Sequence, residues 1–512
     1  MLVHHFLEHS AKTTSEAPAV WYQDQWMTYG EINDLADRVA QFLVEQGIEK
    51  GDGVALLYEN SFDYIIHYYG ILKAGAITVA LNTASTVEKL IYLLNDSGAK
   101  AVVSNQKFTR KLMAALPAFT SLEFMLLDHE EAEGSQTCPI FQVHEIYQNT
   151  PNRSVLPEIT EKDLASIVYT SGSTGKPKGV TLSHLNLVTN TRSIVQYLKL
   201  TARDRMMVVL PFYYIYGKSL LNTHFAVGGS LVIDNRFAFP AAVLDTMQKT
   251  EVTGFAGVPS NFMILLERSN IREHRFEHLR YVTQAGGGMP VPVQQEVARV
   301  FDPARLYIMY GATEASARLS YLDPDELPRK WGSIGKAIPD VTLSVLDENS
   351  NEVPVGHVGE IVARGKNIMQ GYWNDPVETA QVLKNGIYYT GDLGYKDEEG
   401  FFFIVGRKKE MIKTGGERVS PKEIEDCFYH IPEVQEAAVI GVEDAILGEA
   451  IHAFIVLKSN ATITKPELEK GIKKQLAPYM HPREIHLVDA LPKNESGKIL
   501  KTRLKLNEEV VG

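Results

Sequence analysis

The feature that most constrains the fold is a regular alternation of short apolar segments with amphipathic segments, which runs from residue 28 to about residue 325. In the first amphipathic segment, Thr28 and Glu31 have the spacing of a helix capping box, and Gly47 ends the predicted helix. The pattern continues as strand 54–58, helix 62–75, strand 77–81, helix 85–98 and strand 101–104. Strands and helices that alternate at this spacing form parallel sheets covered by helices, so we predict an α/β fold.

The sequence changes character twice after this region. Short strands broken by Gly, Asn and Asp turns predict an antiparallel subdomain. Further on, Ser420 and Glu423 have capping-box spacing with Pro421 at the first helical position, and mixed strands and helices follow. The predicted units are a large N-terminal domain, residues 1–406, which includes the antiparallel subdomain of residues 332–406, and a small mobile α+β C-terminal domain, residues 407–512.

Composition excludes several functional classes. A net charge of -12 over 512 residues offers no broad basic surface, so we expect no nucleic-acid partner. The longest apolar stretch, which starts at Met206, contains a proline and is too short to span a membrane. The N-terminus lacks the pattern of a secretory signal, and only Cys138 and Cys427 occur, as is common in a reducing compartment. We therefore expect a cytoplasmic protein without a membrane span.

Three histidines, His4, His5 and His9, lie close together near the start of the chain. Imidazole is a common metal ligand, so these residues could form a metal cluster. A mobile or loosely packed N-terminus accounts for them more simply, and we predict no metal site there.

The sequence YTSGSTGKPKG, residues 169–179, predicts an anion site. It follows a predicted buried strand, residues 166–170, and ligands of α/β sheets bind where strands end. Glycines let the backbone approach an anion, and hydroxyl and N–H groups supply donors. The segment is not a nucleotide-binding P-loop, because Pro177 stands where the second glycine of that motif should be and keeps Lys176 from continuing into a helix. We expect a flexible anion-binding flap.

Four further motifs follow in order: AGGGMP (285–290), YGATE (310–314), YYTGD (388–392) with GRKKEMIKTGGERVSPKEIE (406–425), and PKNESGK (492–498). With the first motif they resemble the signatures of the adenylate-forming superfamily, which comprises acyl-CoA synthetases, free-standing adenylation enzymes and firefly luciferase. The resemblance covers essentially the whole chain. It implies that a carboxylic acid attacks the α-phosphorus of Mg-ATP, that pyrophosphate leaves, and that the acyl group then passes to a phosphopantetheine thiol of CoA or of a carrier protein.

The resemblance also implies a role for residues of each motif. Those expected to hold the ATP phosphates are Thr170, Ser171, Gly172, Ser173, Thr174, Gly175 and Lys178. Those expected around adenine and ribose are Gly287, Gly288, Met289, Tyr310, Gly311, Ala312, Asp392, Ile404 and Arg407. Those expected at the reacting phosphate and Mg²⁺ are Thr313, which donates to a phosphate, Glu314 and Thr174 as metal ligands, and Lys498, which stabilises developing charge. The expected hinge is Lys409, and the expected thiol path contains Lys413, Gly415 and Gly416.

The acid is predicted to bind in a pocket built from three segments, by Tyr213, Tyr214, Ile215, Lys218, Gly257, Gly286 and Gly288. Amino-acid-activating relatives carry an aspartate for the ammonium group where this sequence has Ile215. A buried apolar residue would leave an ammonium group unpaired at a cost of several kcal/mol, which favours an acid without an α-amine. Lys218 could bind a second polar group, but we expect it to extend to solvent. The tyrosines and glycines suggest a medium-sized, cyclic or aromatic acid.

Other functions stay open at this point. If the alignment at Ile215 slips by one residue, an imino acid such as proline, loaded onto a carrier protein, becomes the substrate. A luciferase-like oxygenase would consume oxygen after adenylation. A catalytically inactive carrier-binding module would release no pyrophosphate, and a phosphoryl-transfer ATPase would release ADP.

Overall fold

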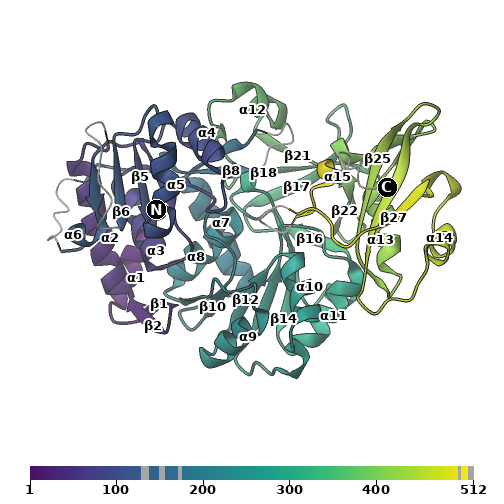
Figure 1. The fold of residues 1–512 in the computed structure, drawn as a ribbon, viewed down its shortest axis with the longest axis horizontal. Helices are drawn as coiled ribbons and strands as arrows, with labels where there is room; N and C mark the ends of the chain where they lie inside the picture. Colours follow the sequence, from purple (N-terminus) through teal and green to yellow (C-terminus); the bar gives the residue numbers. More distant parts are fainter. Residues whose placement is uncertain (129–137, 149–155, 171–175, 494–497, 505–512) are drawn as a thin grey trace.

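The computed structural model describes residues 1–128, 138–148, 156–170, 176–493 and 498–504, and within these ranges it forms three β-sheets packed with helices (Figure 1). Two sheets with mainly parallel central strands occupy the N-terminal part of the chain, and a smaller sheet occupies the C-terminal part. The α/β class predicted from the alternating pattern is confirmed. No helix in the described ranges is both long enough and apolar enough to cross a bilayer.

The first sheet has the strand order β19-β9-β8-β4-β3-β5-β6-β7. Its strands are β3 (Gly53–Leu57), β4 (Ile77–Ala80), β5 (Ala101–Asn105), β6 (Phe124–Asp128), β7 (Ile140–Gln142), β8 (Leu164–Thr170), β9 (Lys178–Ser183) and β19 (Gly371–Tyr372). Its associated helices are α2 (Tyr29–Glu45), α3 (Phe62–Lys73), α4 (Val87–Ser97), α5 (Gln106–Ala115) and α6 (Val143–Ile146). Strands β3 to β8 pair in parallel, whereas β9 and β19 extend the sheet in antiparallel fashion.

The second sheet runs β17-β18-β21-β22-β16-β15-β14-β13-β12-β10-β11-β1-β2, with β20 paired to β21. Its parallel part contains β1 (Pro18–Tyr22), β10 (Arg205–Val208), β11 (Ser230–Ile233), β12 (Gly254–Gly257), β13 (Tyr281–Gln284) and β14 (Arg305–Tyr310), with β2 (Gln25–Thr28) antiparallel at the edge. Its helices are α7 (His184–Leu198), α8 (Ile215–Val227), α9 (Pro240–Lys249), α10 (Pro259–Arg268) and α11 (Val291–Val300).

The other end of this sheet is antiparallel, as predicted. It contains β15 (Ser320–Leu322), β16 (Ser333–Ala337), β17 (Val341–Leu346), β18 (Gly359–Gly365), β20 (Leu383–Lys384), β21 (Ile387–Lys396) and β22 (Phe402–Arg407). One segment departs from the prediction, because Gly371 and Tyr372 of β19 pair with Thr181 and Val180 of β9 in the first sheet. The predicted subdomain therefore contributes a strand that joins the two large sheets.

The third sheet has the order β24-β23-β26-β25, with β27 paired in parallel to β26. Its elements are β23 (Ile412–Thr414), β24 (Glu417–Val419), α13 (Pro421–Tyr429), β25 (Val434–Asp444), β26 (Gly448–Leu457), α14 (Lys465–Lys473), β27 (Glu484–Leu487) and α15 (Lys501–Leu504). Pro421 is the first residue of α13, but the predicted capping box at Ser420 is wrong. The Ser420 hydroxyl instead donates to the Val405 carbonyl at 2.6 Å, so it links the third sheet to β22.

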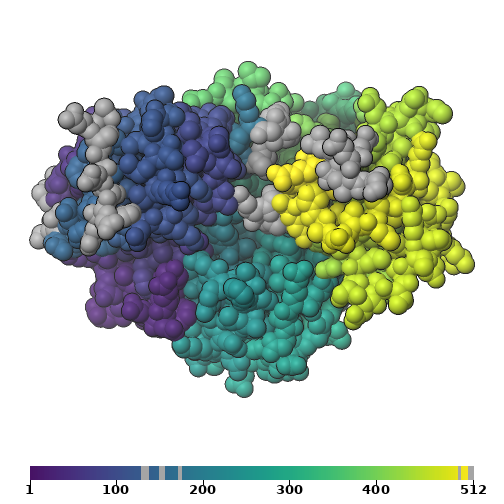
Figure 2. Space-filling model, viewed as in Figure 1, coloured from purple at the N-terminus to yellow at the C-terminus, as the bar shows by residue number. Residues whose placement is uncertain are grey.

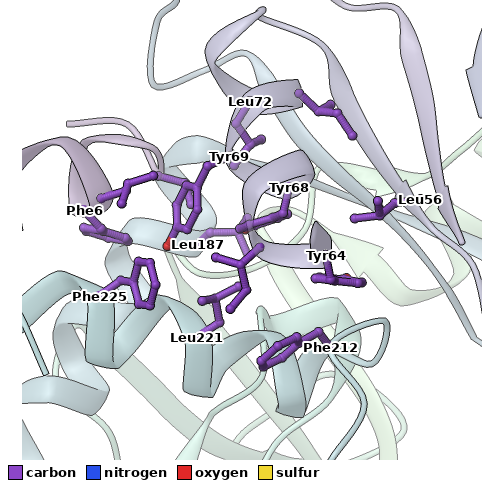
Figure 3. Packing of buried hydrophobic residues seen from close by; sticks show 14 of the residues in the cluster. Phe6, Leu56, Tyr64, Tyr68, Tyr69, Leu72, Leu187, Phe212, Leu221 and Phe225 are labelled. Carbon is purple, nitrogen blue, oxygen red and sulfur yellow. The ribbon is translucent and has the colours of Figure 1, made fainter. Parts of the chain in front are cut away.

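An aromatic contact joins the first two sheets (Figure 3). Tyr69 on α3 lies flat against Phe225 on α8, with ring centroids 5.4 Å apart and planes at 14°. Tyr64 packs against Phe212 with centroids 5.3 Å apart, and all four side chains are fully buried. Burying aromatic side chains is among the largest favourable terms in a core. This contact therefore fixes α3 and the first sheet relative to α8 and the second sheet.

The N-terminus is packed, contrary to the prediction of a loose segment. Helix α1 (His5–Thr13) buries Phe6 and Leu7, and the Val3 backbone N–H donates to Nδ1 of His184 at 3.1 Å. His4 is 5% exposed, and burial lowers its pKa well below the usual range. His4 packs as part of the core, His5 is half-buried and His9 is exposed on α1, so this segment is a packed helix rather than a loose tail.

A buried ion pair beneath α1 gives a stability prediction. The Lys73 ammonium donates to Asp37 and to Asn33, each at 2.7 Å, and the Lys73 and Asp37 side chains are 1% and 2% exposed. Lys73→Met leaves the Asp37 carboxylate buried without its ammonium partner, and we expect a loss of about 3–5 kcal/mol in the free energy of unfolding. Unfolding in urea, monitored by circular dichroism, measures this free energy.

The double variant Lys73→Met with Asp37→Leu serves as the control. Since both charges are then gone, most of the lost stability should return. Equal destabilisation in the single and double variants would show that packing rather than charge dominates at this position.

Candidate active site

Asp392 is the most firmly held of the predicted site residues. It lies on β21, is 5% exposed, and accepts a hydrogen bond from the Tyr310 hydroxyl at 2.6 Å. Its other carboxylate oxygen lies 2.8 Å from Nε of Arg407, which is its register partner on β22. Burial first, and then the Asp392 carboxylate, raise the pKa of Tyr310 well above its usual range. Three predicted nucleotide contacts, Tyr310, Asp392 and Arg407, are thus brought together around one carboxylate.

Glu314 lies four residues after Tyr310 in the chain and is also held by a tyrosine. It lies in the short helix η4 (Thr313–Ala315), and its Oε1 accepts from the Tyr372 hydroxyl at 2.8 Å. Burial and the Glu314 carboxylate raise the pKa of Tyr372, so this hydroxyl stays a donor. Gly311 permits the sharp path into η4, since a Cβ there would lie 2.0 Å from the Ala317 carbonyl oxygen. The backbone turn at Gly311 and the hydrogen bond from Tyr372 therefore set the position of Glu314, the predicted metal ligand.

The ends of the predicted anion loop meet on neighbouring strands. Thr170 at the end of β8 pairs with Lys178 at the start of β9, while Ser171, Gly172, Ser173, Thr174 and Gly175 lie outside the described residues. The Lys178 ammonium forms an ion pair with Glu378 of α12 (Pro376–Val382) and lies 5.3 Å from the centre of the Tyr372 ring. Lys178, on β9, and Glu314, in η4, therefore contact the same tyrosine.

Two of the segments predicted to line the acid pocket lie in contact. A Cβ on Gly286 would lie 3.0 Å from the Val258 side chain, next to Gly257, and Gly286 has a φ of +85° that favours glycine. The Gln284 amide donates to the Gly287 carbonyl at 2.8 Å and shapes the turn before Gly288 and Met289.

The third segment is joined to these by α8. The Tyr216 hydroxyl donates to the Thr283 carbonyl on β13 at 3.0 Å. Tyr213 and Tyr214 lie with ring centroids 4.7 Å apart, and Asn82 donates to the Tyr214 hydroxyl at 3.2 Å. Ile215 begins α8 and is half-buried against apolar neighbours.

Lys218 does not extend to solvent, so that expectation is wrong. It is fully buried, and its ammonium donates to the Ser166 hydroxyl on β8 at 2.8 Å and lies 5.3 Å from the centre of the Tyr68 ring. Burial lowers the pKa of Lys218 to about 7. Lys218 thus connects α8 to the strand that carries the anion loop.

Lys498 reaches this region from the C-terminal part of the chain. Desolvation first, and then the Arg407 guanidinium, lower the pKa of Lys498, whereas Glu410 and Asp392 act in the opposite direction. Lys498 is therefore close enough to Asp392 and Arg407 for their charges to shift its pKa. Figure 2 shows the yellow and yellow-green C-terminal region packed against the teal middle of the chain.

The residues predicted for the hinge and the thiol path lie beyond this group. Lys409 is in η6 (Lys408–Glu410), between β22 of the second sheet and β23 of the third. The Lys413 N–H donates to Glu449 at 2.7 Å and the Gly415 N–H donates to the Leu447 carbonyl at 2.9 Å, both within the third sheet. Gly416 is the exposed second residue of this turn. Ile404 lies on β22 and packs in the antiparallel core.

Sequence reasoning missed Tyr372 and Glu378. Tyr372 lies on β19, a strand of two residues that carries no periodic signal, and Glu378 lies on the short helix α12 that follows it. The aromatic run Tyr372-Trp373 within a polar segment was the available indication, because exposed aromatic residues often mark contacts. Only the pairing of β19 with β9 shows which residues they contact.

The chain matches two family models. The model described as AMP-binding enzyme covers residues 7–373, and the model described as AMP-binding enzyme C-terminal domain covers residues 423–498. A long-chain-fatty-acid–CoA ligase of Bacillus subtilis is 32% identical in an alignment 530 residues long, gaps included. The alignment covers 98% of this chain and 94% of that protein.

Solved structures give the same result. ATP-bound MatB from Rhodopseudomonas palustris superposes with a TM-score of 0.88 at 30% identity, covering 99% of each chain. O-succinylbenzoate coenzyme A synthetase from Bacillus subtilis, in complex with ATP and magnesium ion, superposes with a TM-score of 0.84 at 29% identity, covering 98% of this chain and 99% of that one.

The Lys178–Glu378 ion pair generates a prediction for this site. A phosphate that binds Lys178 must compete with Glu378, whose side chain is 23% exposed. Glu378→Gln removes the competing charge, and since a partly exposed ion pair contributes about 1 kcal/mol, we expect ATP to bind about fivefold more tightly. Isothermal titration calorimetry with ATP measures the change.

Glu352→Gln is a matched control, because it breaks the exposed Lys396–Glu352 pair in the same antiparallel region. It should leave ATP affinity unchanged. An affinity in Glu378→Gln that is equal to or weaker than that of the unaltered chain would contradict a phosphate-binding role for Lys178.

Proposed function

The chain belongs to the AMP-binding enzyme family and is an AMP-forming ligase, and from this premise we propose that it joins a carboxylic acid without an α-amine to the thiol of coenzyme A. The observation that carries the proposal is the buried Asp392 carboxylate, held by Tyr310 and by its ion pair with Arg407, with Lys498 near enough for the charges of this pair to shift its pKa. A cation from one part of the chain and a rigid carboxylate from another are then available to one nucleotide.

In the proposed first step the substrate carboxylate attacks the α-phosphorus of ATP, forms an acyl-adenylate and releases pyrophosphate. Two negatively charged groups must approach each other, so the main task of the protein is positioning and charge stabilisation. Asp392, oriented by Tyr310 and Arg407, accepts hydrogen bonds from the ribose hydroxyls. Lys498 donates to the oxygens on which charge develops.

The residues present fit a bound Mg²⁺. Glu314 supplies a hard oxygen donor, and its hydrogen bond from Tyr372 fixes the orientation of the carboxylate, as outer contacts of metal ligands commonly do. Mg²⁺, when bound, neutralises phosphate charge. Thr174, the second predicted ligand, lies outside the described residues. Lys178 and Thr170 flank the loop that we propose holds the outer phosphates.

The choice of acid and acceptor rests on the pocket and on the relatives. Ile215 offers no counter-charge for an α-ammonium group at the start of α8, and burying an unpaired charge is costly. The relatives are named for a long-chain fatty acid and for o-succinylbenzoate, both linked to CoA. Tyr213 and Tyr214 would line the wall of the acid pocket.

We also propose that the segment around Lys409 separates two moving parts, residues 1–406 and 407–512. Support comes from the change of sheet across η6, where β22 ends in the second sheet and β23 starts the third. In a second arrangement the turn with Lys413, Gly415 and Gly416 would approach the adenylate and admit the thiol. The carboxylate attacks in the first step and the thiol in the second. Because the two nucleophiles differ, two arrangements of the C-terminal part around the same site would serve the two steps.

Product identity tests the proposed reaction. With an accepted acid, ATP and CoA, we expect AMP, pyrophosphate and an acyl-CoA thioester, because attack at the α-phosphorus leaves AMP on the acid. Acid-dependent ATP–pyrophosphate exchange over fatty, aromatic and dicarboxylic acids and amino acids, including proline, identifies the substrate. Exchange with α-amino or imino acids alone would overturn the inference from Ile215, and thioester formation only on a carrier protein would overturn CoA as acceptor.

Lys498→Ala tests the role of the mobile cation. Loss of a donor to the developing charge should lower the rate of adenylation by about 10²- to 10³-fold. Thioester formation from supplied acyl-adenylate should remain near that of the unaltered chain, which shows that the variant is folded. Lys474→Ala at the end of α14 is the matched control and should keep full exchange activity. Adenylation at the normal rate in Lys498→Ala would remove its assigned role.

A further inference from the structure

Three side chains of types that bind metal ions gather on the third sheet, and none of them belongs to the candidate active site. Strands β26 and β27 pair in parallel so that His452 lies beside Glu484 and Phe454 lies beside His486. Because alternate residues of a strand face the same side, His452, Glu484 and His486 share one face of the sheet. The intervening Ala453 and Ile485 face the opposite side and pack in the core with α13 and α14.

The donor atoms of these side chains form a compact triangle. Nδ1 of His452 lies 3.1 Å from Nε2 of His486, and Oε2 of Glu484 lies 3.9 Å and 3.8 Å from these two nitrogens. Ligands arranged tetrahedrally at about 2.1 Å from Zn²⁺ lie about 3.4 Å from one another. The three observed separations lie on either side of this value, so side-chain shifts of a few tenths of an ångström suffice.

The surroundings hold the ligands in place while leaving a route from solvent. The His486 ring lies almost parallel to the Phe454 ring, with centroids 4.6 Å apart and planes at 19°. The side chains of His452 and His486 are 18% and 13% exposed, and that of Glu484 is 45% exposed. An ion can therefore approach past Glu484 and reach two imidazoles whose positions are already restricted by packing.

We propose that His452, Glu484 and His486 bind a divalent transition-metal ion on the C-terminal part of the chain. Two imidazoles and one carboxylate suit Zn²⁺ and its neighbours in the first transition series, whereas Mg²⁺ prefers oxygen ligands. The bound ion links β26 to β27 and leaves at least one coordination position for water. This site is distinct from the Glu314 site and does not depend on the proposed ligase reaction.

A second group of similar composition, His4, His5 and Glu8, shows why the pattern alone is not sufficient. All its donor atoms lie within 4.8 Å of one another. The Lys73 ammonium, however, lies 3.7 Å from Glu8 and so places a positive charge where a cation would bind. This group supplies a matched control.

The metal site faces the segment that carries Lys498. Leu491, Leu504 and the half-buried Ile499 pack with Ala438 and Ile440 on the same side of the sheet, where Ile440 is the register neighbour of His452. A bound ion would thus stiffen the strands on which the Lys498 segment rests.

Direct titration tests the proposal. The full-length protein, stripped of metal with a chelator, is titrated with Zn²⁺ in the presence of excess Mg²⁺, by calorimetry and by thermal unfolding. We expect one Zn²⁺ to bind per chain and to raise Tm, because an ion that binds only the folded state stabilises it. Absence of binding, or displacement of Zn²⁺ by Mg²⁺, would overturn the proposal.

Three variants locate the ion. His486→Phe keeps an aromatic ring on Phe454 but removes a ligand, and Glu484→Gln keeps the shape while removing the charge. We expect His486→Phe to weaken Zn²⁺ binding by more than about 100-fold, above the range typical of outer contacts, and Glu484→Gln to weaken it as well. His5→Gln should bind as the unaltered chain does. Unchanged binding in folded His486→Phe, verified by circular dichroism, or loss of binding in His5→Gln, would contradict this location.

Discussion

The aromatic contact between α3 and α8 is the interaction on which the candidate site depends. The predicted anion loop follows β8 of the first sheet, whereas Asp392 lies on β21 of the second sheet and Glu314 lies in η4, which follows β14 of the same sheet. Neither sheet alone holds both sets of groups. Since Tyr69 and Phe225 are fully buried and stacked, the two sheets cannot slide past each other without exposing large apolar surfaces. Core packing thus sets the distance between the residues proposed to bind phosphate and the residue proposed to bind the metal ion.

Strand β19 completes this arrangement with very few residues. Its pairing with β9 places Tyr372 between Lys178 and Glu314, so that the same side chain contacts the cation of one sheet and the carboxylate of the other. The buried Lys218–Ser166 contact adds a second link, from α8 to β8. Both links are polar and lie close to the ends of strands. The apolar contact fixes the sheets, and these polar contacts then fix the orientation of individual groups.

Features that depend on neighbouring residues could be predicted from the sequence, whereas those that depend on distant partners could not. The capping box at Thr28 is present because both of its partners lie within four residues. The same spacing at Ser420 does not form a capping box, because the Ser420 hydroxyl donates a hydrogen bond to a backbone carbonyl of β22 instead. The end of β8 at Thr170 was predicted from the strand pattern, and Asp392 and Arg407 were predicted as nucleotide contacts from their motifs, although not as an ion pair. The burial of Lys218 and the contacts of Tyr372 arise from pairing across sheets, which no local spacing encodes.

The charges around Lys498 bear on the proposal that the C-terminal part of the chain moves between the two steps. Desolvation and the Arg407 guanidinium both lower the pKa of Lys498, whereas Glu410 and Asp392 act in the opposite direction without restoring it. A triphosphate would supply the missing negative charge and favour the arrangement seen here. Once pyrophosphate leaves, that stabilisation shrinks while the repulsion from Arg407 persists. The electrostatic balance would therefore favour release of Lys498 after adenylation, which is what a second step by a different nucleophile requires.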